Sequence, residues 1–169
     1  DKNKFQSLSL ENSKSETFTF LTIGRLVAVK NIALQIEAMA QIKEKCHLMI
    51  VGSGPELANL KDLVKKLNLE KKVEFFPWSN DPVKFLSQAD CFLLTSDSEG
   101  YAMVIAEAVL ANLPVIMTDV GVAGELVEDN INGFVIPVNN LAILKQKMEL
   151  VMKNKDLLGT CFSKNFFHV

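Results

Sequence analysis

Apolar residues follow two patterns along the chain, and from Phe18 onward these patterns alternate. Six short runs are almost wholly apolar, as expected for strands that are buried on both faces of a sheet. The predicted strands are Phe18 to Ile23, His47 to Val51, Val73 to Phe76, Cys91 to Thr95, Pro114 to Met117, and Phe134 to Ile136. The longer segments between them carry apolar residues at helical spacing.

Each of the first two predicted helices presents one apolar face. The positions that form these faces are Ile32, Ile36, Met39 and Ala40 in the first helix, and Leu57, Leu60, Val64 and Leu67 in the second. Pro55 suits the first turn of the second helix, where an amide has no partner inside the helix. Further helices are predicted at Pro82 to Gln88, Tyr101 to Asn112, Gly124 to Glu128, and Leu141 to Lys153.

Strands that alternate with helices in this order predict an α/β fold of the Rossmann-like type. Right-handed crossovers then give a single doubly wound, mostly parallel sheet of about six strands with helices on both faces. With 169 residues, 49% of them hydrophobic, the chain is long enough for one core and too short for two full-sized domains. We expect a linker at residues 1–17, the domain at 18–153 and a tail at 154–169. Because the sequence begins at Asp1 rather than Met, we also expect a fragment or a processed chain.

Charge and cysteine content exclude several classes of partner. The formal charge of −2, from 18 basic and 20 acidic residues, provides no basic field for nucleic acid, so a small ligand is expected. Cys46, Cys91 and Cys161 are too far apart for a disulfide framework or a close-spaced zinc site and are interpreted as reduced cytoplasmic thiols. No apolar stretch is long enough to span a bilayer.

Candidate binding residues follow directly after the predicted strands. In doubly wound sheets, ligands bind outside the carboxyl ends of the strands. The residues found there are Gly24, Arg25 and Lys30 after the first strand, Gly52, Ser53 and Gly54 after the second, Ser96 to Gly100 after the fourth, and Thr118, Asp119 and Gly121 after the fifth. His47 and His168 are distant from these loops, and no serine has the G-x-S-x-G surroundings of a hydrolase nucleophile.

Two carboxylates eight positions apart give the strongest local signal. Glu99 precedes a predicted helix, where Gly100 and the first helical amides form an anion-binding end. Glu107 is the only charge within that helix, on a side that also carries Met103 and Leu110, and a buried carboxylate needs donors. The alternative is that both residues are structural, with Glu99 as a solvated helix cap and Glu107 in an ion pair in the core. Together the two carboxylates favour a ligand that carries hydroxyl groups.

Arg25 and Lys30 place two cations on the loop after the first strand. A guanidinium and an ammonium together bind a diphosphate well, but an exposed basic loop is the equally valid alternative. Gly52 and Gly54 form neither a P-loop nor a full dinucleotide fingerprint. Trp78, after the third strand, fits a packing residue better than a residue that stacks on a base.

Taken in order, these motifs resemble the group-1 retaining glycosyltransferases, which are built from two Rossmann-like domains (the GT-B architecture). The resemblance runs from about Phe18 to Val138 and is to the C-terminal, donor-binding domain. It rests on Gly-Arg-Leu-Val with Lys30, Ile50 to Pro55, Gln88 to Leu94, Ser98 to Tyr101 with Glu107-Ala108, Leu113 to Ile116, Thr118 to Gly121, Glu125 to Val127, and Asn132 to Phe134. Each motif is weak alone, and their order is specific.

The resemblance implies a role for each candidate residue. Arg25 and Lys30 hold the donor diphosphate and stabilise it as a leaving group, and with Glu99 they form the catalytic set. Glu107 takes the ribose hydroxyls, and Glu99 contacts the transferred hexose beside the amides of Tyr101 and Ala102. Gly24, Gly52, Gly100 and Trp78 complete the expected binding residues. No metal or cofactor is expected beyond the donor, a nucleotide-diphosphate sugar such as a UDP-sugar.

The resemblance also implies a partner domain that binds a glycan or lipid-linked acceptor, a role in polysaccharide synthesis, and a fragment that is inactive alone. It leaves open whether the full-length enzyme associates peripherally with a membrane. Tyr101-Ala102 and Val122-Ala123-Gly124 depart from the family pattern near the sugar subsite, so the sugar is left undefined. Two alternatives stay open: half of a sugar-nucleotide epimerase, and a non-catalytic nucleotide-binding module. A phospho-acceptor signalling domain is disfavoured because Gly24-Arg25-Leu26 replaces its acidic cluster.

Overall fold

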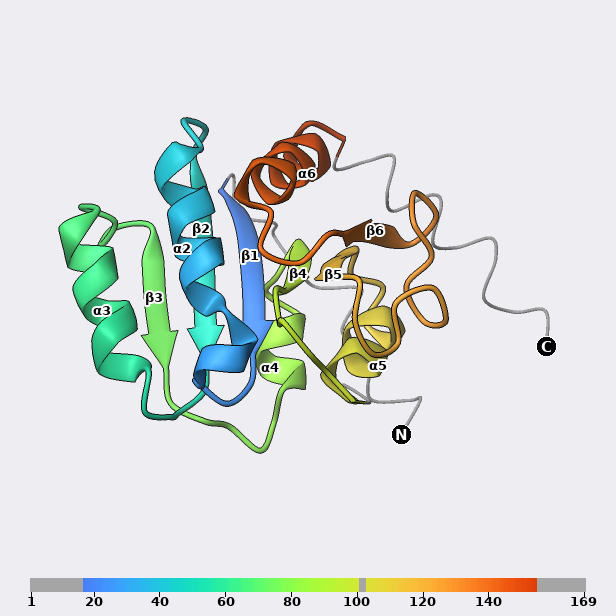
Figure 1. Cartoon of the computed structure of the whole chain (residues 1–169), viewed down its shortest axis with the longest axis horizontal. Coiled ribbons are helices and arrows are strands. Elements are labelled where there is room, and N and C mark those ends of the chain that lie inside the picture. The colour runs from blue at the N-terminus through green and yellow to red at the C-terminus, as the bar shows by residue number, and fades with distance from the viewer. Residues whose placement is uncertain (1–16, 101–102, 155–169) are drawn as a thin grey trace.

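A six-stranded parallel sheet forms the centre of the structure, a computed structural model that describes residues 17–100 and 103–154. The strands are β1 (Phe18–Ile23), β2 (Cys46–Val51), β3 (Val73–Phe76), β4 (Cys91–Leu94), β5 (Val115–Thr118) and β6 (Gly133–Ile136). Their order is β3-β2-β1-β4-β5-β6, and every neighbouring pair is parallel (Figure 1). The predicted doubly wound sheet is confirmed.

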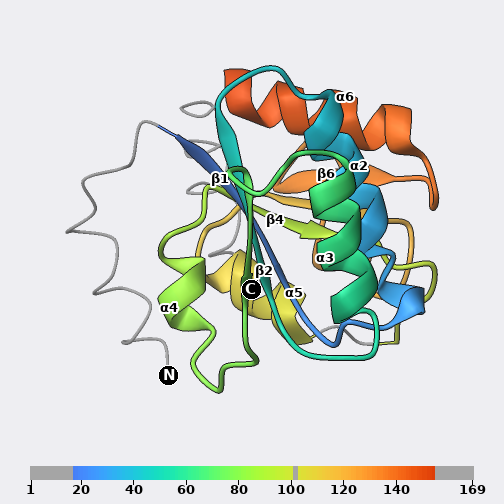
Figure 2. The same cartoon turned by 90° about the vertical axis from the view of Figure 1, so that its left-hand side faces the viewer.

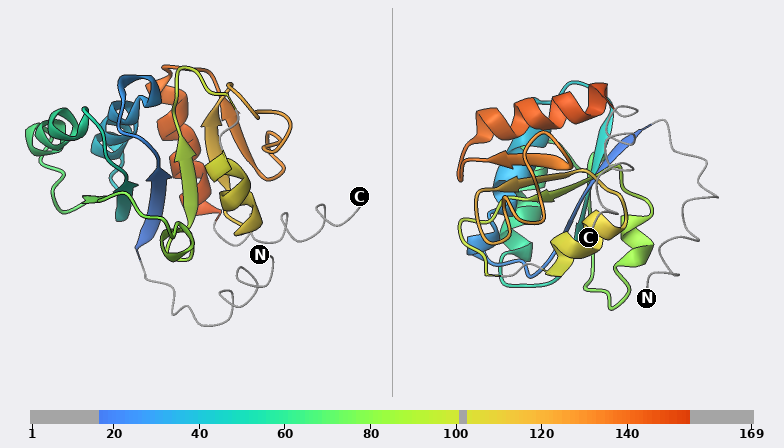
Figure 3. Two further views of the ribbon diagram at one scale, coloured as in Figure 1. Left: turned by 90° about the horizontal axis from the view of Figure 1, so that it is seen from below. Right: turned by 90° about the vertical axis from the view of Figure 1, so that its right-hand side faces the viewer.

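Helices cover both faces of the sheet. One face carries α2 (Ile32–Gln41), α3 (Leu57–Lys66) and α6 (Leu141–Lys153), with α2 against both of the others. The opposite face carries α4 (Val83–Leu86) and α5 (Met103–Leu110), as Figures 2 and 3 show. A short 3-10 turn, η2 (Ala28–Lys30), precedes α2.

The two faces divide the apolar residues of each strand between two cores. Phe20 packs in the core beneath α2, α3 and α6, and the next residue, Leu21, packs in the core beneath α4 and α5. Leu48 and Met49 divide in the same way on β2. Because successive strand residues point to opposite faces, burial on both sides requires an unbroken apolar run.

The prediction of a helix at Gly124 to Glu128 is wrong. This segment forms turns in which Gly124 has φ of 80° and its amide donates to the carbonyl of Val127 at 2.9 Å. The Asn132 side chain accepts from the Glu128 amide and donates to the Leu126 carbonyl, both at 2.8 Å. The positive φ of Gly124 and the two bonds of the Asn132 side chain hold the segment in turns.

Smaller differences concern helix ends and the terminal segments. Pro55 lies in the turn before α3, whose first residue is Leu57, and not in its first helical turn. Helix α4 covers only Val83–Leu86. Most of the expected linker and tail, and also Tyr101, Ala102, Cys161 and His168, lie outside the described residues. Within the described ranges, no helix is both long and apolar enough to cross a membrane.

The loops after β1 and β2 pack backbone against backbone. The amide of Leu26 donates to the Ser53 carbonyl at 2.9 Å, which extends the pairing of the two strands beyond their ends. A Cβ atom on Gly52 would overlap the Gly24 carbonyl oxygen, and one on Gly54 would overlap the backbone of Leu26. Both glycines therefore hold the β1 loop in place.

Candidate functional site

The candidate site lies at the carboxyl ends of β1 and β4, the two neighbours at which the order of the sheet reverses. The chain leaves β1 for α2 on one face and leaves β4 for α5 on the other, so the loops after these strands diverge (Figure 1). This point is the preferred place for ligands in open α/β sheets. The two loops carry Lys30 and Glu99.

Lys30 and Glu99 meet across this switch point. The Lys30 ammonium donates to the Glu99 carboxylate, which also accepts a hydrogen bond from the Ser96 hydroxyl at 2.6 Å. The side chains are 23% and 11% exposed, so the pair is shielded from most but not all solvent. Sequence reasoning placed both residues at this edge and did not foresee that they pair.

Asn31 ties the surrounding loops together. It has φ of 45°, and its side-chain amide donates to Asp97, at 3.2 Å, and to Asn139. The Asp97 amide donates to the Val29 carbonyl at 2.8 Å. These contacts join the loops after β1, β4 and β6. Sequence reasoning placed Asp97 at this edge but missed Asn31 and Asn139, since single asparagines in loops carry no distinctive signal.

Gly121 packs directly under the loop that carries Glu99. Its φ is 58°, and a Cβ atom there would overlap the Gly100 carbonyl oxygen and lie 3.1 Å from the Glu99 Cβ. The loop after β5 thus supports the loop after β4 through a contact that only glycine permits.

The other expected binding residues differ in how available they are. Arg25 is exposed and its side chain makes no hydrogen bond or ion pair with any residue in the described ranges, so its guanidinium is available to a ligand. The amides of Gly24 and Gly52 instead donate to the Val51 and Phe76 carbonyls, each at 3.0 Å. Trp78 is 54% exposed after β3, which does not fit a packing residue.

Glu107 is half-buried in the middle of α5, and desolvation by burial raises its pKa. Among the described residues its carboxylate has no hydrogen-bond or ion-pair partner, so no core ion pair is seen. Its helical neighbours Met103 and Leu110 are 65% and 55% exposed, which corrects the expectation of a buried apolar face. A carboxylate with a desolvated and unpaired charge can gain donors from a ligand.

Glu107→Gln is expected to stabilise the protein at pH 7. The raised pKa means that the folded state binds the proton more tightly than the unfolded state, so stability falls as pH rises from about 4.3 through the raised pKa. Glutamine removes this penalty, and its advantage should disappear below about pH 4. Urea unfolding at both pH values checks the sign. Glu70→Gln, at an exposed loop position, is the control, and an equal gain from it contradicts the prediction.

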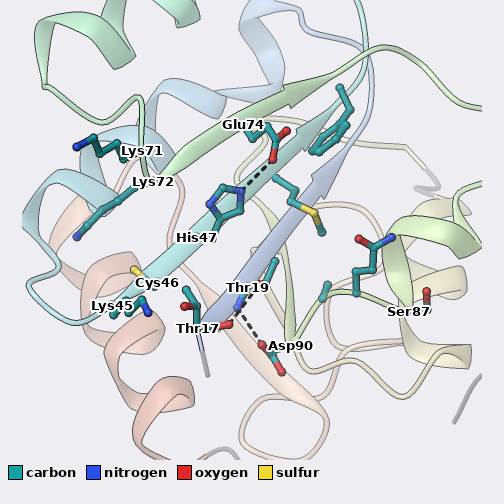
Figure 4. A pocket seen from close by; sticks show the side chains of 14 residues that line it. Thr17, Thr19, Lys45, Cys46, His47, Lys71, Lys72, Glu74, Ser87 and Asp90 are labelled. Carbon is teal, nitrogen blue, oxygen red and sulfur yellow. Dashed lines mark hydrogen bonds and ion pairs between the residues drawn. The ribbon is translucent and has the colours of Figure 1, made fainter. Parts of the chain in front are cut away.

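A hollow of about 600 Å³ lies at the opposite, amino-terminal ends of the strands. Figure 4 shows His47 directed toward Glu74, with 3.4 Å between them, and Thr19 whose amide donates to Asp90. None of the residues predicted for the site lines it. Across residues 17–100 and 103–154, no cluster of three His, Cys, Asp or Glu residues could hold a metal ion.

The family of the chain follows from comparison with known proteins. The family described as "Glycosyl transferases group 1" matches residues 4–164. The chain belongs to this family. Group 1 membership agrees with the order of motifs from the β1 loop to Phe134 and confirms the resemblance seen in the sequence.

Curated group 1 relatives share about one third of their aligned residues with this chain. An uncharacterized glycosyltransferase of Haemophilus influenzae is 33% identical over 150 residues, covering 86% of this chain and 42% of that protein. The N-acetylgalactosamine-N,N'-diacetylbacillosaminyl-diphospho-undecaprenol 4-alpha-N-acetylgalactosaminyltransferase of Campylobacter jejuni is 32% identical over 150 residues, covering 88% and 41%. The chain therefore spans less than half the length of these relatives.

Solved structures share the fold of this group 1 chain. HepE of Anabaena, solved with UDP, superposes with a TM-score of 0.83 at 25% identity, covering 96% of this chain and 46% of that chain. TarM of S. aureus, solved with UDP among other ligands, gives a TM-score of 0.81 at 25% identity, with 92% and 33% covered. The Rossmann-like sheet described above is thus the fold of a part of these larger proteins.

Proposed function

We propose that this chain is the donor-binding part of a retaining glycosyltransferase. It would bind a nucleotide-diphosphate sugar, such as a UDP-sugar, from which a hexosyl unit passes to a glycan or lipid-linked acceptor. The observation that carries the proposal is the contact of Lys30 with Glu99 at the switch point of a group 1 member. Solved relatives that contain UDP or UDP-glucose support the choice of donor class.

The chemistry assigns separate tasks to the cations and the carboxylate. The bond between the anomeric carbon and the diphosphate breaks, and its electron pair passes to the diphosphate. The acceptor oxygen bonds to the same carbon on the face that the diphosphate leaves, and the acceptor proton passes to a diphosphate oxygen. Arg25 and Lys30 stabilise the negative charge that develops on the leaving group, and Glu99 binds sugar hydroxyls. An ammonium has three N–H donors, so Lys30 can contact Glu99 and a phosphate together.

The nucleoside is assigned to Glu107 and Trp78. The unpaired carboxylate of Glu107 can accept two hydrogen bonds from ribose hydroxyls. Trp78, exposed on the loop after β3, offers an aromatic face to the base. Gly100, Tyr101 and Ala102 are assigned to the sugar and phosphate, as the family resemblance implies.

Exposed apolar residues around the site support a second domain that faces it. Val29, Trp78 and Val138 lie on three different loops at the carboxyl ends of the strands and are 42%, 54% and 42% exposed. We assign acceptor binding to that domain and expect this chain alone to bind donor without transfer, because transfer requires both reactants to be held together. A cytoplasmic enzyme of polysaccharide synthesis fits this assignment.

The proposal is tested by measuring the binding of nucleoside diphosphates to the 169-residue chain. We expect UDP, GDP or ADP to raise the thermal midpoint with Kd on the order of 0.1–1 mM, because only the folded state binds. Arg25→Ala should weaken binding by about 1.5–3 kcal/mol through the loss of charge-assisted hydrogen bonds. Lys65→Ala, an exposed cation on α3, is the matched control. No shift with any of these nucleotides, or equal loss in both variants, contradicts the proposal.

A further inference from the structure

Three polar side chains are buried beneath the candidate site. Thr22 of β1, Gln35 of α2 and Thr95, directly after β4, are 5%, 0% and 1% exposed. The Gln35 amide donates to the Thr95 hydroxyl at 2.9 Å and lies 3.5 Å from the Thr22 hydroxyl. The group joins α2 to both strands of the switch point.

The Thr95 hydroxyl connects this group to the backbone beside Lys30. It donates to the Asn31 carbonyl at 3.0 Å, with the Lys30 carbonyl at 3.3 Å. The next residue, Ser96, donates through its own hydroxyl to Glu99. Two consecutive residues therefore hold the two members of the ion pair, Thr95 through the backbone of Lys30 and Asn31, and Ser96 through the carboxylate of Glu99.

Stability alone does not explain these polar residues. The Gln35 side-chain oxygen is buried without a hydrogen-bond partner in the described part of the chain. A buried acceptor that has lost water without gaining a donor destabilises the fold, whereas an apolar side chain of similar size would not. The amide nitrogen of Gln35 is the useful group, because it fixes the Thr95 hydroxyl as an acceptor toward Gln35 and a donor toward the Lys30 loop.

We propose that Gln35 and Thr95 are positioning residues, which set the backbone of Lys30 so that its ammonium reaches both Glu99 and the donor diphosphate. This inference rests on the proposed function. Neither side chain touches the ligand. Their effect on binding passes through the placement of Lys30.

The test separates stability from placement with four variants. Thr95→Val takes from the buried Gln35 amide its 2.9 Å acceptor, and Gln35→Leu takes from the buried Thr95 hydroxyl its donor, so both should lower the thermal midpoint and weaken UDP binding about tenfold. The double variant Gln35→Leu/Thr95→Val removes both partners of this contact and leaves the Asn31 carbonyl its bond from the Leu34 amide, so it should regain or exceed the parent midpoint, while UDP binding stays about tenfold weaker. Thr95→Ser keeps the hydroxyl and should bind UDP as the parent does.

A second comparison shows whether the effect passes through Lys30. In a Lys30→Met background, the double variant should cause no further loss of UDP affinity, because the group that it positions is absent. A full additional tenfold loss in that background overturns the inference. So does parent-like UDP binding by the double variant.

A ligand-free measurement keeps the inference distinct from the proposed function. In NMR spectra of lysine ammonium groups, contact with Glu99 should slow proton exchange at Lys30 in the parent and in Thr95→Ser. The double variant should lose this signal. If no nucleotide binds the parent but the Lys30 signal behaves as described, the proposed function fails and the positioning role stands. An unchanged signal in the double variant overturns the positioning role.

Discussion

Lys30→Met is expected to remove most of the affinity for nucleotide diphosphates. Methionine keeps most of the length of the side chain but loses the charge that contacts Glu99 and that we assign to the diphosphate. We expect Kd to rise about 30- to 100-fold, on the order of 2–3 kcal/mol. The loss also leaves the Glu99 carboxylate, 11% exposed, without its cation, so the variant should unfold at a lower urea concentration.

Two further variants separate these effects. Lys30→Met/Glu99→Gln removes the unpaired charge and should recover stability but not binding. Lys45→Met, an exposed lysine at the amino-terminal ends of the strands, should bind as the parent does. Calorimetric titration with UDP and urea unfolding measure the two quantities. Near-parent affinity in Lys30→Met would falsify the assignment of Lys30 to the diphosphate.

Gly121→Ala is expected to disturb the site from below. The new Cβ atom would overlap the Gly100 carbonyl and approach the Glu99 Cβ, so the loop after β4 must move. Forcing a left-handed conformation on alanine adds about 1–2 kcal/mol. We expect a total destabilisation of about 2–4 kcal/mol, and a loss of nucleotide binding comparable to that of Lys30→Met.

Gly124→Ala is a matched control for Gly121→Ala. Gly124 also has positive φ, 80°, but a Cβ atom there would meet nothing within 4 Å. The control therefore carries the conformational cost alone, about 1–2 kcal/mol, and should keep nucleotide binding. Equal behaviour of the two variants in unfolding and titration would show that contact with Glu99 and Gly100 is not what Gly121 provides.

The sequence predicted the strands well because their burial leaves a direct trace. The bounds of each strand lie close to the bounds of an apolar run, because residues on both faces of the sheet are buried, as Phe20 and Leu21 show. The position of Arg25, Lys30 and Glu99 at one edge also followed, because parallel strands bring their carboxyl ends together. Short segments such as Gly124 to Glu128 failed, because a few apolar residues fit a turn and a helix equally.

Contacts between distant loops could not be predicted. Lys30 pairs with Glu99, and Gly121 packs on Gly100, through geometry that depends on how three loops leave the sheet. The close packing of Gly52, an expected binding residue, on the Gly24 backbone was likewise not foreseen. The exposure of Met103 and Leu110 could not be predicted either, because the sequence alone does not distinguish an exposed apolar residue on a helix from a buried one.

The central place of β1 has a consequence for how the chain folds. β1 pairs along one edge with β2, but its other edge must wait for β4, where Leu21 meets Phe92 about 70 residues later along the chain. Closing a loop of this length costs entropy before its contacts reward it, which slows folding. During synthesis, β1, β2 and β3 can associate first. The edge of β1 next to the candidate site stays unpaired until β4 has left the ribosome.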